Sequence, residues 1–435
     1  MALLDKEAVL TRHSYYEATV RRSASAAALA GRVSADVCVV GGGYAGLAAG
    51  LELAQRGFRV ALLEARQVGW GASGRNGGQV LTGFGFAGQE AIEVQLAPAD
   101  ARRAWDISLQ GVQWLRQQIA GHGIDCEYVA GHVSLAIGRR KARALERWVA
   151  HLAQRYDYEL QFIPPAEVRD WIASPRFHAG AFDPGSGHLH PLKYCLGLAR
   201  AAQAAGVALF EHSPALAIEA GSRPTVKTAH GAVDCQYVVL AGNVYLGEFG
   251  RALAPSLVDR IMPVGTYVIA SAPLPPARAA ALIRQRSAAF DTNLVLDYFR
   301  VTADHRVLFG GGESYTTATP LRLKEKMRRR MLEVFPQLAD LEVPYVWGGF
   351  VDITMNQAPD FGRLGGNVYY LQGFSGHGLA LAGMAGRLVA EAVAGTAERF
   401  DLFTRVRHRA FPGGRWLRTP ALVLGMLYYR LRDLL

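Results

Sequence analysis

Residues 35–66 read ADVCVVGGGYAGLAAGLELAQRGFRVALLEAR, an apolar strand, a glycine turn, a helix and a second strand in succession. The turn has the G-x-G-x-x-G spacing at Gly41, Gly43 and Gly46. The first glycine turns the chain, the second lets backbone N–H groups approach a pyrophosphate, and the third allows the helix to pack closely on the strand. An ordinary βαβ turn is the alternative, but the flanking elements favour a dinucleotide site.

The residue that ends the second strand indicates which nucleotide binds. Glu64 follows Val60–Leu63, where a carboxylate accepts hydrogen bonds from both ribose hydroxyls. A carboxylate there disfavours a 2′-phosphate, so the pattern predicts FAD or NAD rather than NADP. The helix that begins near Tyr44 points its positive end at the phosphates.

Length and composition limit the class of protein. The 435 residues, half of them apolar, predict two domains or one large domain with an insertion. There is no run of 18 apolar residues and the first 22 residues are charged and polar, so we expect a soluble, cytoplasmic protein. The net charge of +10 is spread along the chain without a nucleic-acid module, which argues against a nucleic-acid partner.

The four cysteines, Cys38, Cys126, Cys195 and Cys235, have no CxxC spacing. Cys38 occupies a position in the first strand that suits a small apolar side chain. We expect reduced, structural cysteines and no metal site. A covalent flavin link through one of them is the less favoured alternative, so FAD is expected to bind non-covalently.

The order of the remaining elements predicts two discontinuous domains. After the first βαβ unit, the loop 68–79 takes the place of the next strand and helix that a nicotinamide dehydrogenase would have. Hydrophobic patterns predict helices near 98–120, 140–155, 191–205 and 321–335, and a last helix that ends before Gly395. Strands are predicted within 127–137, 208–210, 215–219, 225–228, 236–243, 261–312, 345–350 and 368–372. We expect a cofactor domain of residues 1–95, 180–255 and 348–435, and a substrate domain of 96–179 and 256–347.

Two further glycine-rich segments suit a long ligand. In GASGRNGGQ (71–79), glycines permit close bending while Ser73, Arg75, Asn76 and Gln79 supply donors, and Arg75 suits a pyrophosphate or an internal ion pair. The turn GFSGHG (373–378) opens a helix whose free N–H groups suit the negative charge of a reduced flavin. A mobile surface loop and a capped core helix are the respective alternatives. Together with the first turn, the segments favour FAD.

These motifs resemble a known family. ADVCVVGGGYAGL, GWGASGRNGGQ, WGGFVDIT and GFSGHGLALAGMAGRLVAEA, with SYYEAT near the start and FPGGRWLRTPALVL near the end, are similar to FAD-dependent amine oxidoreductases of the gamma-glutamylputrescine oxidoreductase family, within the D-amino-acid oxidase, glycine oxidase and sarcosine oxidase group. The resemblance covers nearly the whole chain. It implies an α/β fold, with a glutathione-reductase-type FAD-binding Rossmann domain and an α+β substrate domain of mixed, largely antiparallel sheet.

The resemblance also implies the cofactor contacts. The three glycines of the first turn would cradle the pyrophosphate, Glu64 would bind the ribose, 72–79 would run beside the pyrophosphate and flavin ring, and 373–379 would hold the pyrimidine edge. The expected set is Gly41, Gly43, Tyr44, Ala45, Gly46, Glu64, Ala65, Arg66, Gly71, Ala72, Ser73, Arg75, Asn76, Gly77, Gly78, Gln79, Leu216, Ala241, Gly242, Gly373, Phe374, Ser375, Gly376, Gly378 and Leu379.

The implied reaction oxidises an amine to an imine that water hydrolyses, and it needs a positioned, deprotonated amine rather than strong acid–base residues. Expected catalytic residues are His377, Tyr298, Tyr315 and Trp347, and expected substrate-binding residues are Tyr267, Arg300 and Gln357. Core packing is the alternative for each aromatic residue, and a structural hydrogen bond for His377. Gln357 stands where many relatives carry arginine, which leaves the substrate open.

The expected substrate is gamma-glutamylputrescine, with oxygen as acceptor. The alternatives are a secondary or D-amino acid such as pipecolate, oxidised with transfer of electrons to a membrane carrier, and an FAD-binding protein without turnover. The stretch 411–435 combines apolar PALVLGMLYY with arginines and could lie on an anionic membrane, although packing on the protein's own surface or at a dimer contact is favoured. The sequence does not fix the oligomeric state.

Overall fold

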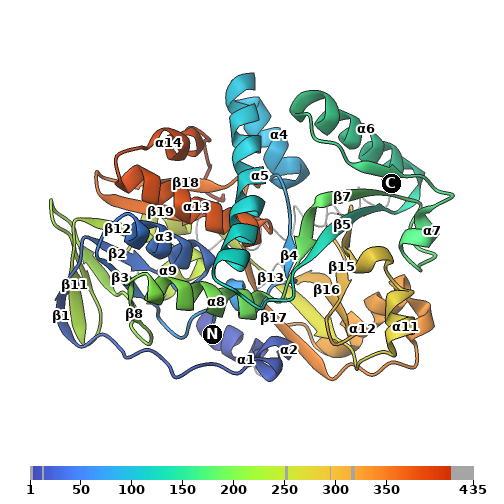
Figure 1. Ribbon diagram of the computed structural model, residues 1–435, viewed down its shortest axis with the longest axis horizontal. Coiled ribbons are helices and arrows are strands. Elements are labelled where there is room, and N and C mark those ends of the chain that lie inside the picture. Colours follow the sequence, from blue (N-terminus) through green and yellow to red (C-terminus); the bar gives the residue numbers. More distant parts are fainter. Residues whose placement is uncertain (1–2, 12–13, 250–252, 294, 315–318, 413–435) are drawn as a thin grey trace.

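The computed structural model describes residues 3–11, 14–249, 253–293, 295–314 and 319–412 (Figure 1). Three sheets organise these residues. In the view of Figure 1, a six-stranded and a four-stranded sheet lie to the left and a nine-stranded sheet to the right, with the long helix α5 (Pro98–Gly121) standing between them. The mixed α/β fold predicted from the sequence is confirmed.

The six-stranded sheet begins with the stretch that carries the glycine turn. Its order is β18 (Asp360–Leu364), β19 (Val368–Gln372), β12 (Tyr237–Leu240), β2 (Val37–Val40), β3 (Val60–Leu63) and β8 (Ala208–Phe210). All neighbours pair in parallel except β18 with β19. β2, β3 and β19 are buried at every position, which explains their unbroken apolar runs.

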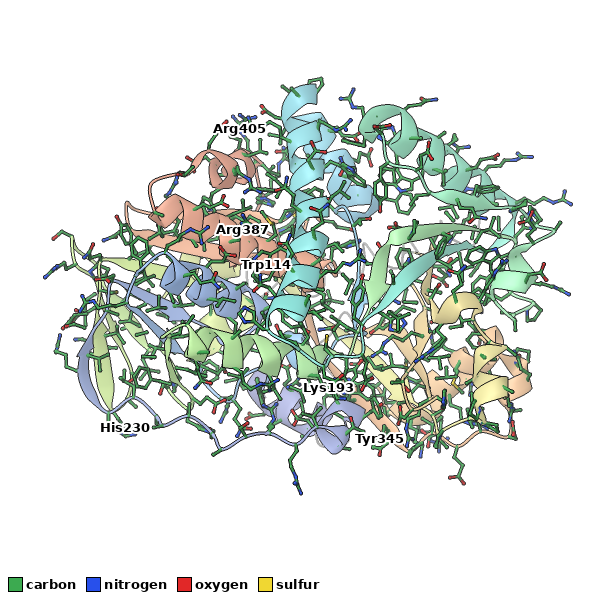
Figure 2. The ribbon with its side chains drawn as sticks, in the orientation of Figure 1. Trp114, Lys193, His230, Tyr345, Arg387 and Arg405 are labelled. Atoms are coloured by element: carbon green, nitrogen blue, oxygen red, sulfur yellow. The ribbon has the colours of Figure 1, made fainter. Side chains whose placement is uncertain are left out.

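Small residues set the helix packing over this sheet. α3 (Tyr44–Gln55) packs against α8 (Pro191–Ala204) and α13 (Gly378–Val393), which is followed by α14 (Glu398–Thr404). A Cβ on Gly386 of α13 would lie 2.5 Å from the Ala49 nitrogen of α3, so glycine is needed for this approach. Trp114 of α5, labelled in Figure 2, donates from its indole to Glu52 Oε1 of α3 at 2.6 Å.

A small four-stranded sheet flanks the six-stranded one. Its order is β1 (Gly31–Ser34), β11 (Gly231–Asp234), β10 (Thr225–Lys227) and β9 (Ala217–Glu219). Short helices connect nearby segments: α1 (Leu3–Leu10), α2 (Tyr15–Thr19), α9 (Leu246–Phe249) and α10 (Pro255–Val258).

The nine-stranded sheet forms the other half of the molecule. It runs through β17 (Tyr345–Thr354), β13 (Ile261–Ala270), β16 (Val307–Ser314), β15 (Tyr298–Val301), β14 (Ala288–Asp291), β5 (Val129–Ala136), β7 (Ala179–His188) and β4 (Gln79–Val80), while β6 (Gln161–Ile163) pairs with β7. Only the pair β14–β5 is parallel among these strands of the described chain. The helices of this half are α4 (Gly85–Gln95), α6 (Gly138–Tyr156), α7 (Val168–Trp171), α11 (Pro276–Ala280) and α12 (Leu323–Val334).

Alternation along these strands separates a core face from a cavity face. Val133, Tyr267 and Phe299 belong to an apolar cluster that also contains Met327 and Met331 of α12. Their chain neighbours His132, Thr266 and Tyr298 point to the opposite face and line a cavity.

Most predicted elements are present, generally within one to three residues of the expected limits, but several strands were not predicted, among them β1, β7, β11 and β18. β7 and all of β17 belong to the nine-stranded sheet, so the chain crosses between sheets near His188 and Thr354 rather than at 180 and 348. We propose the two-domain division expected from the sequence, with its boundaries at 180 and 348 moved to about His188 and Thr354. Most of the basic stretch 411–435 lies outside the described residues.

In the described part of the chain, no single helix has the length and apolar character needed to cross a membrane. Among the residues that the structure describes, α13 and α14 taken together meet that test, and they are bent by 117° relative to each other.

Candidate active site

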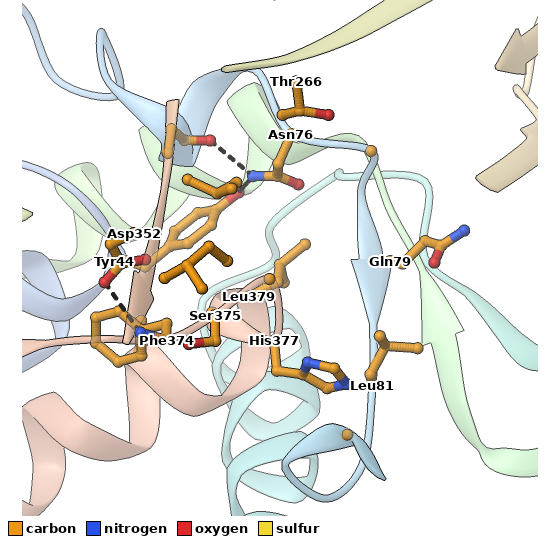
Figure 3. Close-up of a pocket in the computed structure, with 18 of the residues that line it drawn as sticks. Tyr44, Asn76, Gln79, Leu81, Thr266, Asp352, Phe374, Ser375, His377 and Leu379 are labelled. Carbon is orange, nitrogen blue, oxygen red and sulfur yellow. Dashed lines mark hydrogen bonds between the residues drawn. The ribbon is translucent and has the colours of Figure 1, made fainter. Parts of the chain in front are cut away.

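A continuous cavity of about 800 Å³ lies between the six-stranded and nine-stranded sheets. Its lining includes the first glycine turn, the loop 69–77, the turn 374–379 and the cavity face of the nine-stranded sheet. Figure 3 shows part of this wall, where the His377 imidazole points toward Leu81 and Asp352 contacts Phe374. The three glycine-rich segments singled out in the sequence therefore meet around one space.

The first glycine turn has the shape of a phosphate cradle. Gly41 adopts a φ of +115°, and a Cβ on Gly46 would lie 1.9 Å from the Gly41 carbonyl oxygen. A Cβ on Gly43 would lie 2.8 Å from Ser73 Oγ. Each glycine is thus required by backbone geometry or close approach, and the helix α3 begins at Tyr44 with its first turn beside the cavity.

Glu64 lies at the end of β3 beside this turn. Its Oε2 accepts from the Gly42 N–H at 2.6 Å and its Oε1 from the Arg66 N–H at 2.8 Å. Burial raises the pKa of this carboxyl group, although the backbone hydrogen bonds oppose the shift. A carboxylate fixed at this place can accept from ribose hydroxyls. The donors, the acid and the glycine cradle fit the adenosine diphosphate part of FAD.

The ring loop, residues 69–79, is held by its own polar side chains. Ser73 Oγ accepts from the Tyr44 N–H at 3.1 Å, and Asn76 Nδ2 donates to the Ala72 carbonyl at 3.0 Å and to the Tyr44 hydroxyl at 3.4 Å (Figure 3). Gln79 Nε2 donates to the Ala289 carbonyl of β14 at 2.9 Å. The loop therefore joins the two halves of the molecule along the cavity.

Arg75 forms an internal ion pair, one of the two roles considered from the sequence. Its Nη1 lies 3.3 Å from Glu7 Oε1, and the two side chains are 5% and 0% exposed. The Tyr245 hydroxyl also donates to Glu7, and the Arg75 guanidinium lies 5.0 Å from the centre of the Trp70 ring. Glu7, on the N-terminal helix α1, was not recognised as part of the site, because nothing in its local sequence marks it.

Asp352, another residue that was not predicted, holds the turn 373–379, which we call the late turn. Its Oδ2 accepts from the Gly373 N–H and, at 2.9 Å, from the Phe374 N–H, while its carbonyl accepts from the Ser375 N–H at 2.9 Å. Burial raises the pKa of this carboxyl group to about 6, against the effect of the backbone hydrogen bonds. The motif WGGFVDIT contains Asp352, so its acid could have been noticed as the partner of the turn.

Replacing Asp352 with alanine is expected to weaken FAD binding about 10- to 100-fold, because two buried N–H groups of the turn lose their acceptor. The matched variant Asp352→Asn keeps one acceptor oxygen and should stay within a few-fold of the parent. Titration of the apoprotein with FAD, followed by quenching of flavin fluorescence, measures both. Equal affinities for Asp352→Ala and the parent protein would show that the carboxylate does not position the turn.

The predicted catalytic and substrate-binding residues fall into four groups. Tyr298, His377 and Gln357 line the cavity. Tyr267 does not, because strand alternation turns it into the core and presents Thr266 and Val268 instead. Tyr315 lies outside the described residues.

Arg300 and Trp347 support the ring loop from behind instead of lining the cavity. Arg300 is 1% exposed and its Nε donates to the Gly77 carbonyl at 2.9 Å, while an Nη donates to the Tyr16 hydroxyl at 3.2 Å. The Trp347 indole donates to the Arg75 carbonyl at 2.9 Å. Both side chains are on the cavity face of the sheet, but the loop covers them. Neither side chain therefore lines the cavity.

Most of the predicted cofactor residues line the cavity; the exceptions are Gly46, Gly78, Leu216 and Gly373. Gly46 and Gly373 lie directly behind lining segments. A Cβ on Gly78 would meet the Leu189 carbonyl at 2.2 Å, so this glycine serves loop packing. Leu216 is 37% exposed, and its neighbour Ala215 lines the cavity in its place.

Two neutral imidazoles face the cavity. Burial lowers the pKa of His377, and burial lowers the pKa of His132 to about 3. His377 Nδ1 and His132 Nε2 are buried without a hydrogen-bond partner in the described residues. Beside His132 across the β5–β7 pair, Asp183 accepts from Thr82, Tyr158, Gly185 and Ser186. This wall can accept or donate hydrogen bonds without carrying a fixed positive charge.

The four cysteines are free and buried, and none of them lines the cavity. The sequence prediction of reduced, structural cysteines agrees with this arrangement. No group of three or more metal-ligating side chains occurs among the residues that the structure describes.

Comparison with protein families matches residues 36–392 to the DAO family, described as FAD dependent oxidoreductase. The chain is similar to gamma-glutamylputrescine oxidoreductase of Escherichia coli, with 39% identity over 98% of this chain and 99% of that protein. It is also 39% identical to a probable oxidoreductase of Haemophilus influenzae, over 92% of each chain.

Solved structures support the fold. Glycine oxidase from Geobacillus kaustophilus superposes with a TM-score of 0.70 at 23% identity, covering 83% of this chain and 95% of that one. L-proline dehydrogenase from P. horikoshii gives a TM-score of 0.69 at 20% identity, covering 84% and 94%. At these identities the likeness concerns the fold alone.

Proposed function

Because the chain belongs to the DAO family of FAD-dependent oxidoreductases, we propose that it oxidises the terminal amine of gamma-glutamylputrescine. Oxidation removes two electrons and two protons from the C–N unit and gives an imine, which water hydrolyses to an aldehyde and ammonia. The observation that carries the proposal is 39% identity over nearly the full length of both chains to an enzyme named for this substrate.

The cofactor residues follow from the cavity. We propose that the glycine turn holds the pyrophosphate, Glu64 the ribose, the ring loop one side of the flavin, and the turn 373–379 its pyrimidine edge. When bound, FAD supplies the two-electron acceptor. Asp352 fixes the turn and the Glu7–Arg75 pair fixes the loop, so both walls are held before the substrate enters.

The charges on the cavity wall favour an amine without a carboxylate on the reacting carbon. The Lys and Arg residues of the described lining are Arg66, Arg75 and Lys141. Arg75 is paired with Glu7, and Arg66 lies next to Glu64 at the adenosine end. Gln357, which also lines the cavity, is uncharged. A D-amino acid or pipecolate would bring a carboxylate next to the reacting carbon, whereas the remaining cation, Lys141, lies on α6 and is bonded to Asn293, so we place both behind gamma-glutamylputrescine.

The chain's own residues can favour the neutral amine that reacts. Enclosure between the two sheets disfavours an ammonium ion, which lowers the pKa of a bound amine. The neutral imidazole of His377 can hold the amine nitrogen by a hydrogen bond, and the Tyr298 ring forms an apolar wall beside Gly77. We assign His377 a positioning role.

We further propose that oxygen accepts the electrons as hydrogen peroxide and that the enzyme acts in the cytoplasm. Contact of the 411–435 stretch with an anionic membrane remains the alternative that goes with a membrane acceptor. An FAD-binding protein without turnover is the alternative of a different class.

Anaerobic addition of amines to the yellow holoenzyme tests the function. Gamma-glutamylputrescine is expected to bleach the flavin absorbance at least tenfold faster than putrescine, pipecolate, sarcosine or D-alanine at equal concentration. Readmission of air should restore the absorbance with one peroxide per aldehyde. Faster reduction by a free amino acid would overturn the substrate, absence of peroxide would overturn oxygen as acceptor, and no bleaching by any amine would favour the non-catalytic alternative.

A further inference from the structure

The cavity continues past the late turn into a second lobe. This distal lobe lies between helix α6 and the cavity face of the nine-stranded sheet, and its lining includes Phe86, Lys141, Leu145, Trp148, Tyr158 and Asn293. The rings of Phe86 and Trp148 meet with centroids 4.6 Å apart, which joins α4 to α6 over the lobe. The lobe is thus a largely apolar passage with a few polar groups.

The polar groups form a connected set at the end of β14. Lys141 Nζ donates to Asn293 Oδ1, Asn293 Nδ2 donates to Asp291 Oδ2 at 2.8 Å, and the Asn293 N–H donates to Asp291 Oδ1 at 3.0 Å. Between them, Thr292 Oγ1 is buried and has no hydrogen-bond partner among the described residues. All four residues line the cavity. The set therefore offers a cation, a hydroxyl and an amide to a ligand, while Asp291 holds Asn293 in place.

Strand geometry places this set beyond the point where the ring loop meets β14. The ring loop is bonded to β14 at Ala289 through Gln79. Asp291 lies two residues further along, roughly 7 Å at the rise of a strand, and β14 ends there, with Thr292 and Asn293 following in a bend. A ligand that extends from the ring loop to this set needs a chain of several bonds, such as a diamine acylated at its far end.

We propose that this set is a recognition subsite for an α-amino acid head remote from the reacting amine, with Lys141 binding its carboxylate and the Thr292 hydroxyl accepting a hydrogen bond from its ammonium group. The inference rests on the proposed function and explains how an uncarboxylated reacting end can be combined with selection of a gamma-glutamyl substrate. The Lys141 ammonium group and the unpartnered Thr292 hydroxyl carry it, because the head brings a carboxylate for the first and an N–H donor for the second.

The test uses a ligand that cannot be oxidised. N-butyl-L-glutamine, with the butyl group on the side-chain amide nitrogen, keeps the amino acid head and the four-carbon chain but lacks the terminal amine. Its binding to the holoenzyme is followed by calorimetry, with N-butylbutanamide as the headless control. Lys141→Met is expected to weaken binding of N-butyl-L-glutamine about 10- to 100-fold and to leave N-butylbutanamide unchanged. Arg140→Met, an exposed neighbour on α6 outside the cavity lining, should change neither.

The outcomes separate this subsite from the proposed function. Equal binding of N-butyl-L-glutamine by Lys141→Met and the parent enzyme, or no binding to the parent, would overturn the subsite. A weakened headless control would show that the variant damages the lobe and would also count against the assignment. If the head-bearing ligand binds through Lys141 while gamma-glutamylputrescine fails to reduce the flavin, the subsite stands and the proposed reaction is wrong.

Discussion

Gly46→Ala is expected to lose FAD, with affinity reduced about 100-fold or more and colourless protein after purification. A methyl group at this position would lie 1.9 Å from the Gly41 carbonyl oxygen, so α3 must move away from the turn that it supports. Overpacking of this kind costs at least 1–3 kcal/mol, and here the displaced atoms are the phosphate-binding backbone itself. The ratio of flavin to protein absorbance and an FAD titration of the apoprotein measure the loss.

Gly50→Ala in the same helix is the matched control. Its added methyl would meet Leu62 and Val207 at 3.6 Å, an ordinary contact, and alanine favours the helix. This variant should bind FAD like the parent and unfold at an equal or slightly higher temperature. Full flavin content in Gly46→Ala would contradict the assigned cradle. Circular dichroism of both variants distinguishes a lost cofactor from a failure to fold.

Local sequence indicated the glycine-rich segments that line the cavity, because each of them is built from consecutive residues. The glycine turn, Glu64 and the ring loop are each continuous segments whose glycines and acids have specific backbone roles. β2 and β3 of the six-stranded sheet are short apolar runs next to such turns. These patterns report local geometry, so they could be interpreted without knowing the tertiary structure.

The substrate half depends on which face a strand residue occupies, and that is set by pairing. Tyr267 and Thr266 are adjacent in sequence, yet only Thr266 lines the cavity. β7 has the sequence AGAFDPGSGH, typical of a turn, and it forms a strand because it pairs with β5 through a register shift between Ala130 and His132. Other contacts between residues far apart in the sequence bring Glu7 to Arg75 and Asp352 to the late turn. No local pattern indicates these contacts.

Removing Arg75 alone should destabilise the apoprotein by about 3–5 kcal/mol at pH 8, because Glu7 would remain charged in a buried site without its partner. The variant Arg75→Met is compared with Glu7→Gln and with the double variant by chemical unfolding of the apoprotein, so that loss of flavin does not contribute. The double variant removes both charges and should recover most of the loss, giving a large coupling energy. As a control, Arg102→Met breaks an exposed pair with Asp106 and should have no measurable effect.

The pH dependence of this loss has a definite sign. Burial raises the folded-state pKa of Glu7 above its ordinary value, and Arg75 opposes that shift. A raised pKa means that the contribution of Glu7 is fully favourable below its unfolded pKa and is lost as pH rises through the folded value. Without Arg75 the folded pKa rises further, so the deficit of Arg75→Met relative to the parent should be larger at pH 8 than at pH 5. A deficit that is independent of pH, or additive effects of the two single variants, would show that Arg75 acts through packing on Trp70 and not through Glu7.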